Sequence, residues 1–132
     1  MLKNSSFLAI IPARAGSKRL PNKNLLNFAD KPLISWTISS SLKSKYIDKT
    51  IVSTDSELIK KTAIHCGADV PFIRPDSLSG DYATRDGVIK HSINFLQING
   101  QENFDYVVYL QPTSPLRDEI HIDSAIEYLF EK

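Results

Sequence analysis

The fold of this chain is decided by the stretch Phe7-Leu8-Ala9-Ile10-Ile11-Pro12-Ala13-Arg14-Ala15-Gly16-Ser17-Lys18-Arg19. Its first five residues form an uninterrupted apolar run, which is typical of a strand buried on both faces of a parallel sheet. The run opens into a segment that is rich in small residues and cations as far as Lys23. Small residues let backbone N–H groups approach an anion, and the cations supply compensating charge. The stretch therefore predicts an anion site beyond the carboxyl end of a strand, with a solvated basic connection as the alternative.

Strand and helix patterns alternate along the rest of the chain. Further strands are predicted at 49–53 and 106–110, and a shorter extended segment at 70–73. Gly67 is expected to end the second helix. Because the connections are long enough to join parallel strands, the pattern predicts a single α/β domain over 1–132 with a largely parallel sheet. Helices are predicted to begin at Pro32, at the capping-box sequence Thr54-Asp55-Ser56-Glu57, at Asp81 or Thr84, and at Asp118.

The composition limits the class of protein. The 132 residues carry 16 Lys and Arg against 15 Asp and Glu, which gives a net charge of +1. So balanced a charge argues against nucleic acid as a partner. The single cysteine, Cys66, excludes an intrachain disulfide and fits a reducing compartment. No apolar run is long enough for a signal sequence or a membrane span, so we expect a cytoplasmic protein with no membrane partner.

Familiar phosphate and metal signatures are absent from the sequence. Only Gly16 precedes Lys18, whereas a Walker A loop needs a second glycine, and the G-x-G-x-x-G pattern is missing. Neither P-loop phosphoryl transfer nor dinucleotide binding is therefore predicted. The three histidines share no metal-ligand spacing with carboxylates or cysteine, so no metal site is predicted within this chain. Cys66 and Trp36 lie on apolar helix faces and are expected in the core.

Four segments stand out in order along the chain. They are Pro12-Ala13-Arg14-Ala15-Gly16-Ser17-Lys18-Arg19 with Asn22-Lys23-Asn24-Leu25, Val52-Ser53-Thr54-Asp55, Arg74-Pro75 with Leu78, Asp81 and Ala83, and Leu110-Gln111-Pro112-Thr113-Ser114-Pro115-Leu116-Arg117. Together they resemble the signature of the CMP-sialic acid synthetases, or acylneuraminate cytidylyltransferases. The resemblance covers nearly the whole chain and is highly specific. It implies a three-layer, Rossmann-like nucleotidyltransferase fold with a mainly parallel sheet.

The resemblance also implies an activity. Such an enzyme transfers CMP from CTP to the anomeric hydroxyl of a nonulosonic, sialic-type acid and releases pyrophosphate. Attack on the α-phosphorus builds negative charge, which cations and backbone N–H groups stabilise. The resemblance further implies Mg²⁺ with ligands mainly outside this chain, a homodimer in the full-length protein, and a role in lipopolysaccharide or capsule biosynthesis. The acceptor stays open among N-acetylneuraminic, legionaminic and pseudaminic acids, with a Kdo-type enzyme as a related alternative.

Residue roles follow from the same resemblance. Arg14 and Lys23 would contact the triphosphate, helped by backbone N–H groups from Ala15 to Lys18. Asn24, Arg74 and Ala83 would form the cytosine pocket, and Gln111 would lie near the acceptor sugar. The candidate catalytic residues are thus Arg14, Lys23 and Gln111, and the candidate substrate-binding residues are these three with Ala15, Gly16, Ser17, Lys18, Asn24, Arg74, Ala83 and Arg85.

Several of these positions leave alternatives open. Arg85 stands where the sialic-acid enzymes often carry a small hydroxyl residue, and Thr84 offers a hydroxyl one position earlier. Arg74 could instead be a surface residue ahead of a proline. Arg117 is expected either to reach the sugar carboxylate or to pair with a neighbouring acidic side chain. Asp55 is expected either to lie near the active site or to complement the dipole of the helix that follows it.

Family members are longer than this chain. We therefore expect 1–132 to be the nucleotide-binding part of a truncated enzyme, which binds CTP but is inactive or very weakly active alone. The alternative from another class of protein is a non-catalytic nucleotide-sensing or interaction module.

Overall fold

The computed structural model describes residues 1–15, 27–28, 31–79, 84–112 and 118–131. At its centre is a parallel sheet with the order β4-β1-β5, made by β1 (Phe7–Pro12), β4 (Lys49–Ser53) and β5 (Tyr106–Tyr109). The strands expected from the sequence at these positions are confirmed to within one residue at each end. A short antiparallel pair, β2 (Asn27–Phe28) and β3 (Lys31–Pro32), precedes the first helix.

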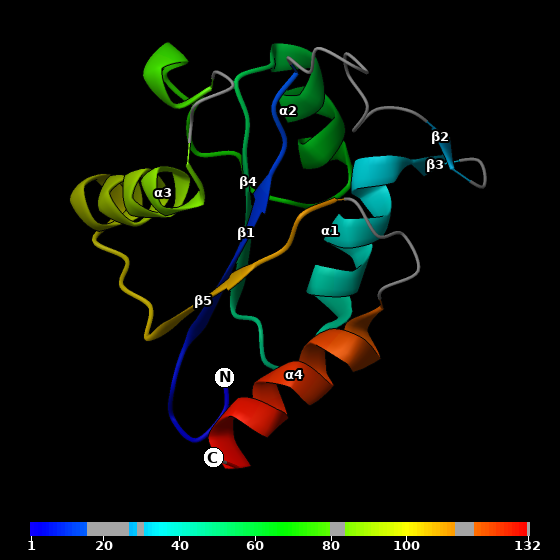
Figure 1. Cartoon of the computed structure of the whole chain (residues 1–132), viewed down its shortest axis with the longest axis vertical. Coiled ribbons are helices and arrows are strands. Elements are labelled where there is room, and N and C mark those ends of the chain that lie inside the picture. Colours follow the sequence, from blue (N-terminus) through cyan, green and yellow to red (C-terminus); the bar gives the residue numbers. More distant parts are fainter. Residues whose placement is uncertain (16–26, 29–30, 80–83, 113–117, 132) are drawn as a thin grey trace.

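Helices cover both faces of this sheet (Figure 1). The described helices are α1 (Leu33–Lys43), α2 (Glu57–His65), α3 (Arg85–Gly100) and α4 (Glu119–Glu131), with a 3₁₀ turn, η2, at Asp76–Leu78. Helices α1, α2 and α4 pack on one face, and α3 packs on the other. The predicted three-layer α/β architecture with a mainly parallel sheet is therefore confirmed. Within the described ranges, no helix combines the length and the apolar character needed to cross a lipid bilayer.

The central strand β1 explains the apolar run that opens the sequence. Its odd-numbered side chains, Phe7, Ala9 and Ile11, are buried against α1, α2 and α4. Its even-numbered side chains, Leu8 and Ile10, are buried on the α3 side. Successive side chains of a strand point to opposite faces, so a strand covered on both sides must be apolar throughout.

The start of α2 differs from the predicted capping box. Ser56, not Thr54, is the N-cap residue, and its hydroxyl accepts the N–H of Ile59 at 3.2 Å. The Thr54 side chain is fully buried and accepts the N–H of Ser56 at 3.1 Å. The predicted cap at Thr54 is therefore wrong by two residues. Leu58, in the first turn of the helix, is 57% exposed.

Other helix boundaries follow the sequence more closely. Thr84 caps α3, because its hydroxyl accepts the N–H of Gly87 at 3.0 Å. Gly67 follows α2 with a φ of +102°, a conformation that glycine adopts without strain. Trp36 and Cys66 are half-buried rather than fully enclosed, and Lys31 lies over the Trp36 ring with Nζ 5.1 Å from its centroid.

The extended segment predicted at 70–73 does not form a regular strand. Instead Asp69 makes an isolated parallel bridge to Ile51. The Asp69 N–H donates to the Thr50 carbonyl at 3.1 Å, and its own carbonyl accepts the Val52 N–H at 2.9 Å. The outer edge of β4 is therefore covered by backbone from this segment.

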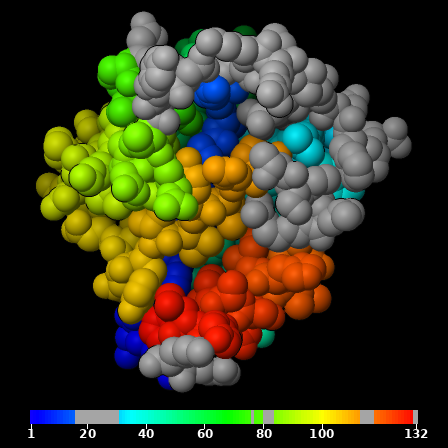
Figure 2. Space-filling model, in the orientation of Figure 1, coloured from blue at the N-terminus to red at the C-terminus, as the bar shows by residue number. Residues whose placement is uncertain are grey.

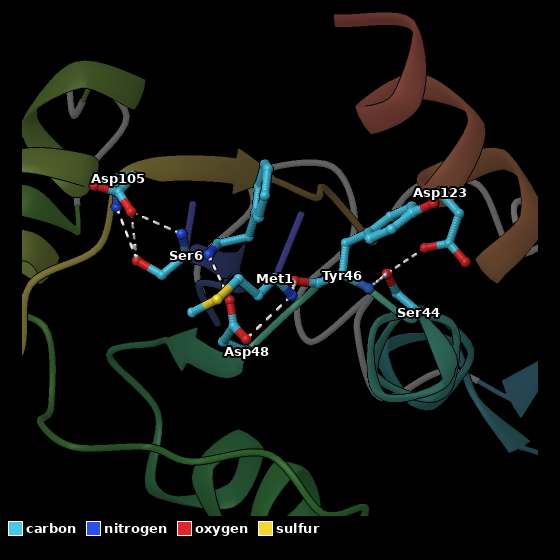
Figure 3. Close-up of polar contacts among 8 residues, drawn as sticks. Met1, Ser6, Ser44, Tyr46, Asp48, Asp105 and Asp123 are labelled. Carbon is cyan, nitrogen blue, oxygen red and sulfur yellow. Dashed lines mark hydrogen bonds and ion pairs between the residues drawn. The ribbon is translucent and has the colours of Figure 1, made fainter. Parts of the chain in front are cut away.

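Aspartates anchor the chain at the amino end of the sheet (Figure 3). Asp48 Oδ2 accepts the N–H of Phe7 at 2.8 Å, and Oδ1 lies 3.2 Å from the N-terminal amine of Met1. Asp105 Oδ2 accepts both the N–H of Ser6 at 2.7 Å and its hydroxyl at 3.2 Å. Both carboxylates satisfy donors at the entry to β1, which would otherwise lack partners.

Asp123 makes the same kind of contact from α4. Its carboxylate is buried and accepts a hydrogen bond from the Ser44 hydroxyl (Figure 3). It accepts another, at 3.3 Å, from the Lys45 N–H. Ser44 is the C-cap residue of α1. Asp123 therefore ties α4 to the end of α1.

Candidate functional site

The carboxyl ends of the three parallel strands meet at one edge of the sheet, opposite the anchored amino end. Arg14 and Ala15 follow β1, Asp55 follows β4, and Gln111 follows β5. Residues far apart in the sequence are thereby brought to the same edge, which is where α/β proteins bind their ligands. Gln111 is exposed there, whereas Arg14 is half-buried.

Asp55 links the ends of β1 and β4. Its Oδ1 accepts the N–H of Ala15 at 2.8 Å. Asp55 directly precedes Ser56, the N-cap residue of α2, so it lies both at the strand ends and at the start of this helix, which agrees with both of its expected roles. We expected the Ala15 N–H to help cradle a phosphate. In this structure it donates to Asp55, so an anion gains that donor only by displacing the carboxylate.

Arg74 is buried, with 4% of its surface exposed, so the reading of it as a surface residue is wrong. Its Nε donates to the Ser53 hydroxyl at 3.0 Å, and Nη2 donates to the Ser53 carbonyl at 2.6 Å. Its Nη1 donates to the Leu78 carbonyl at 3.2 Å. Three of the five guanidinium N–H donors thus join the end of β4 to the 3₁₀ turn.

Arginines gather around this edge. Burial lowers the pKa of Arg74, the carboxylate of Asp55 opposes that shift, and the nearby charge of Arg14 adds to it. Burial raises the pKa of Tyr109, whereas Arg74 and then Arg85 lower it. The charge of Arg14 thus acts on Arg74, and the charges of Arg74 and Arg85 act on Tyr109, so all three arginines lie near this edge. Asp55, and Glu57 and Asp86 in the first turns of α2 and α3, supply negative charge there.

Sequence reasoning missed two residues of this site. Tyr109 is the last residue of β5, and Ser53 is the last residue of β4 and the main partner of Arg74. The only signal for either was its position at the carboxyl end of a predicted strand. Of the predicted site residues, the structure describes Arg14, Ala15, Arg74, Arg85 and Gln111. Gly16, Ser17, Lys18, Lys23, Asn24 and Ala83, together with Arg117, lie outside the described residues.

The described residues do not fit a resident Mg²⁺ site. No group of three or more His, Cys, Asp or Glu side chains gathers among them. The Asp55 carboxylate accepts the Ala15 N–H and interacts with Arg74, whereas Mg²⁺ requires oxygen ligands that are available to it.

Comparison with solved structures identifies the class of fold. The fold matches CMP:2-keto-3-deoxy-manno-octonic acid synthetase, solved in complex with CTP, with a TM-score of 0.76 over 97% of this chain and 48% of that chain. At 21% identity this likeness establishes a nucleotidyltransferase-type fold and nothing finer.

Sequence comparison then places the chain in a family. The family model described as cytidylyltransferase matches residues 8–132, and the chain belongs to this family. It is 46% identical to CMP-N,N'-diacetyllegionaminic acid synthase of Legionella pneumophila over 92% of this chain and 52% of that protein. It is 42% identical to pseudaminic acid cytidylyltransferase of Campylobacter jejuni over 91% of this chain and 51% of that protein. The N-acylneuraminate cytidylyltransferase of Escherichia coli is also 42% identical, over 93% of this chain and 28% of that protein.

These matches confirm the family resemblance found in the sequence. They also show that the chain spans about half the length, or less, of these curated relatives.

Proposed function

We propose that residues 1–132 form the nucleotide-binding part of a cytidylyltransferase that transfers CMP from CTP to a nonulosonic acid and releases pyrophosphate. The observation that carries this proposal is the placement of two arginines at the carboxyl edge of the sheet, Arg14 just after β1 and Arg74 hydrogen-bonded to Ser53 at the end of β4. The family match supports it, as do relatives named for pseudaminic, N-acylneuraminic and legionaminic acids.

In the proposed reaction the anomeric oxygen of the acceptor forms a bond to the α-phosphorus of CTP. The bond from that phosphorus to the oxygen bridging it to the β-phosphate breaks, and the electron pair leaves on pyrophosphate. Negative charge therefore grows on the phosphate oxygens and the leaving group. Cations fixed before the reaction begins stabilise this charge without the cost of reorganising solvent.

Arg14 is suited to this role because it directly follows the buried strand β1. We assign it and Lys23 to the triphosphate, with backbone N–H groups of Gly16, Ser17 and Lys18 completing the cradle. Arg85 adds positive charge from the exposed first residue of α3. Each charge-assisted contact of this kind is worth about 1.5–3 kcal/mol.

Arg74 has a more specific role in this proposal. With three donors committed to Ser53 and Leu78, it shapes the wall of the base pocket, and any contact to cytosine uses its other donors. Asn24 and the backbone carbonyl of Ala83 complete the recognition of the base, because cytosine presents both acceptors and an amine donor. Gln111, exposed after β5, is assigned to the acceptor sugar.

The remaining features belong to the whole enzyme. We place Mg²⁺ ligands mainly outside this chain, a homodimer in the full-length protein, and the activity in the cytoplasm, where it would serve lipopolysaccharide or capsule biosynthesis. The acceptor stays open, because relatives that differ in acceptor share 42 to 46% identity with this chain. A non-catalytic CTP-binding fragment is the second candidate, since the chain spans about half of such relatives.

Thermal unfolding in the presence of nucleotides tests the binding half of this proposal. Ligand that binds the folded state raises stability by RT ln(1 + [L]/Kd), so modest affinity is detectable at millimolar concentration. CTP should raise the Tm more than UTP, GTP or ATP at equal concentration. Equal shifts with all four nucleotides, or none, would contradict cytidine recognition.

A pyrophosphate-release assay tests whether residues 1–132 are active on their own. With CTP, Mg²⁺ and each of the three nine-carbon acids, we expect little or no turnover by this chain alone. Turnover at the rate of a full-length relative assayed in parallel would show that residues 1–132 hold the complete catalytic apparatus.

A further inference from the structure

The inner face of α3 packs against the segment of chain that carries Arg74. Along this segment every second side chain is buried, because Val70, Phe72 and Arg74 are enclosed whereas Ile73 is 38% exposed. Such alternation is that of an extended chain with one buried face, so Phe72 and Arg74 occupy neighbouring positions on the same face. Figure 2 shows the outer side of α3 (yellow-green), which lies at the surface beside β5 (orange).

Two contacts hold this segment against α3, one on each side of Arg74 along the chain. The Phe72 ring packs edge-on against the His91 ring, with centroids 4.5 Å apart and an interplanar angle of 82°. Leu78 lies so close to Gly87 that a Cβ atom there would come within 3.2 Å of Leu78 Cδ2. Gly87 and His91 are four residues apart and therefore share one face of the helix. Because Arg74 Nη1 donates to the Leu78 carbonyl, the guanidinium is held between these two contacts.

His91 carries a buried polar atom that no described residue satisfies. Its Nδ1 is buried and has no hydrogen-bond partner in the described part of the chain. A buried polar atom without a partner costs stability, and a phenylalanine of similar shape would avoid that cost. Packing against Phe72 and Phe95 would therefore be served better by an apolar ring. The cost indicates that the histidine has a role that an apolar ring could not perform.

The charge that acts on His91 is that of Arg74. Burial lowers the pKa of His91 and Arg74 lowers it further, so the ring is uncharged near neutral pH. The aromatic rings packed against it carry no charge either. Protonation of His91 would place a second cation beside a guanidinium that is itself buried. Repulsion between the two would oppose the hydrogen bonds that hold Arg74 to Ser53 and Leu78.

We propose that His91 is a positioning residue for nucleotide binding, which acts through Arg74 and keeps it in place only while the His91 ring is uncharged. This role rests on the proposed function, in which Arg74 shapes the wall of the base pocket. The uncharged ring holds the Arg74 segment against α3. The protonated ring repels the guanidinium, and the base pocket loses its shape. CTP affinity should therefore fall as the pH is lowered through the range in which His91 binds its proton.

Calorimetric titration with CTP at about pH 7.5 and about pH 5.5, on either side of the ordinary histidine pKa, tests this proposal. For each protein the measured quantity is the Kd at the lower pH divided by the Kd at the higher pH. The CTP phosphates also take up protons, but they do so with every protein, so the comparison removes their contribution. The ratio should be at least about threefold larger for the wild type than for His91→Phe, which keeps a ring that cannot be protonated. His65→Phe removes an exposed histidine of α2 and, as the control, should keep the wild-type ratio.

The Arg74 side chain offers a second measurement that needs no ligand. Its Nε–H donates to the Ser53 hydroxyl at 3.0 Å, so its NMR signal reports on this bond. In the ligand-free wild type this signal should shift with the same pH midpoint as the ring protons of His91. In His91→Phe it should stay fixed over the same range. A purely structural role of His91 would not produce this shared midpoint.

Two results would overturn this role of His91 and leave the proposed function standing. One is CTP binding by the wild type with the same ratio of Kd values as His91→Phe, and the other is an Arg74 signal that does not follow His91. No binding of CTP by the wild type would contradict the proposed function itself and, with it, the role of His91. The wild-type NMR titration uses no variant, so it decides the matter even if His91→Phe does not fold.

Discussion

The two ends of the parallel sheet use their charged side chains differently. At the amino end, Asp48 and Asp105 accept backbone N–H groups at the entry to β1, and Asp123 holds the end of α1 (Figure 3). At the carboxyl end, Arg74 is bonded to the end of β4, and the charges of Arg14 and Asp55 act on it.

We infer from this difference that the amino end of the sheet contributes mainly to the stability of the fold, and the carboxyl end mainly to ligand binding. The amino end satisfies its own polar groups internally, so its carboxylates contribute to folding. At the carboxyl end Arg14 and the exposed Arg85 are not part of the internal bonds that hold Arg74, and we infer that their positive charge serves an anion from outside. Arg74 belongs to both roles, because it is buried like a structural residue and lies among the site's cations.

The largest effect is expected from Arg74→Met, because Arg74 is assigned both a structural role and a place in the binding site. Losing the guanidinium leaves the Ser53 hydroxyl without this donor and removes the link to Leu78. We expect a loss of on the order of 3 kcal/mol in the free energy of unfolding, measured by urea denaturation. Arg74→Lys is the matched control and should recover part of this stability. A loss below about 0.5 kcal/mol would show that Arg74 is a ligand contact rather than a structural one.

Asp123→Ala tests the amino end alone. It leaves the buried Ser44 hydroxyl without its carboxylate partner, so the free energy of unfolding should fall by about 2 kcal/mol. Asp123→Asn keeps an acceptor oxygen and should cost less. Calorimetric CTP affinity of either folded variant should match that of the wild type. A change in affinity would mean that the two ends of the sheet are coupled.

Substitutions of Asp55 test the carboxyl end of the sheet, and their expected effect on the free energy of unfolding is smaller. Asp55→Ala removes the acceptor for the Ala15 N–H, so the chain after β1 loses its anchor. We expect CTP affinity to fall by roughly tenfold or less, with little change in stability. Asp55→Asn keeps an acceptor and removes a negative charge from the site, so its affinity should equal or exceed that of the wild type. Equal losses in both variants would contradict the anchoring role.

The smallest effect concerns the pH dependence of stability. Burial lowers the pKa of His91, and the charge of Arg74 lowers it further. The ring of His91 packs edge-on against Phe72, with centroids 4.5 Å apart. A histidine with a depressed pKa in the folded state binds its proton more readily when unfolded. Stability is therefore lost as the pH falls below the unfolded value of about 6.5.

His91→Phe should make this decline shallower. His65 and His121 are present in both proteins, so the difference between the two stability curves isolates position 91. Parallel curves between about pH 7 and pH 5 would show that His91 does not contribute.

Much of the fold could be predicted from the sequence because its signals are local. The apolar run of β1, the cap at Thr84 and the stop at Gly67 each depend on a few neighbouring residues. Which of Thr54 and Ser56 caps α2 depends on tertiary contacts that the neighbouring sequence does not reveal. Thr54 is buried beneath the end of β4, and its carbonyl accepts the Arg74 N–H at 2.7 Å.

At the candidate site, too, the sequence predicts positions along the chain but not the contacts made between distant segments. The position of Arg14 after β1 follows from the strand pattern, but the direction of the Arg74 side chain does not. An Arg-Pro pair gives no local sign that the Ser53 carbonyl, which also accepts the Ala13 N–H at 2.9 Å, lies within its reach. Tyr109 was missed for a similar reason, because only the register of β5 beside β1 brings it to this edge.

Calorimetric titration of the 132-residue chain with CTP and Mg²⁺ is the most direct test of the central claim, that the carboxyl edge of the sheet binds CTP through fixed cations. Arg14→Ala is the matched variant, since Arg14 lies at that edge and not among the amino-end anchors. The account predicts saturable, CTP-selective binding by the wild type and at least about tenfold weaker binding by Arg14→Ala. Binding of equal strength in both proteins, or no binding by the wild type, would contradict it.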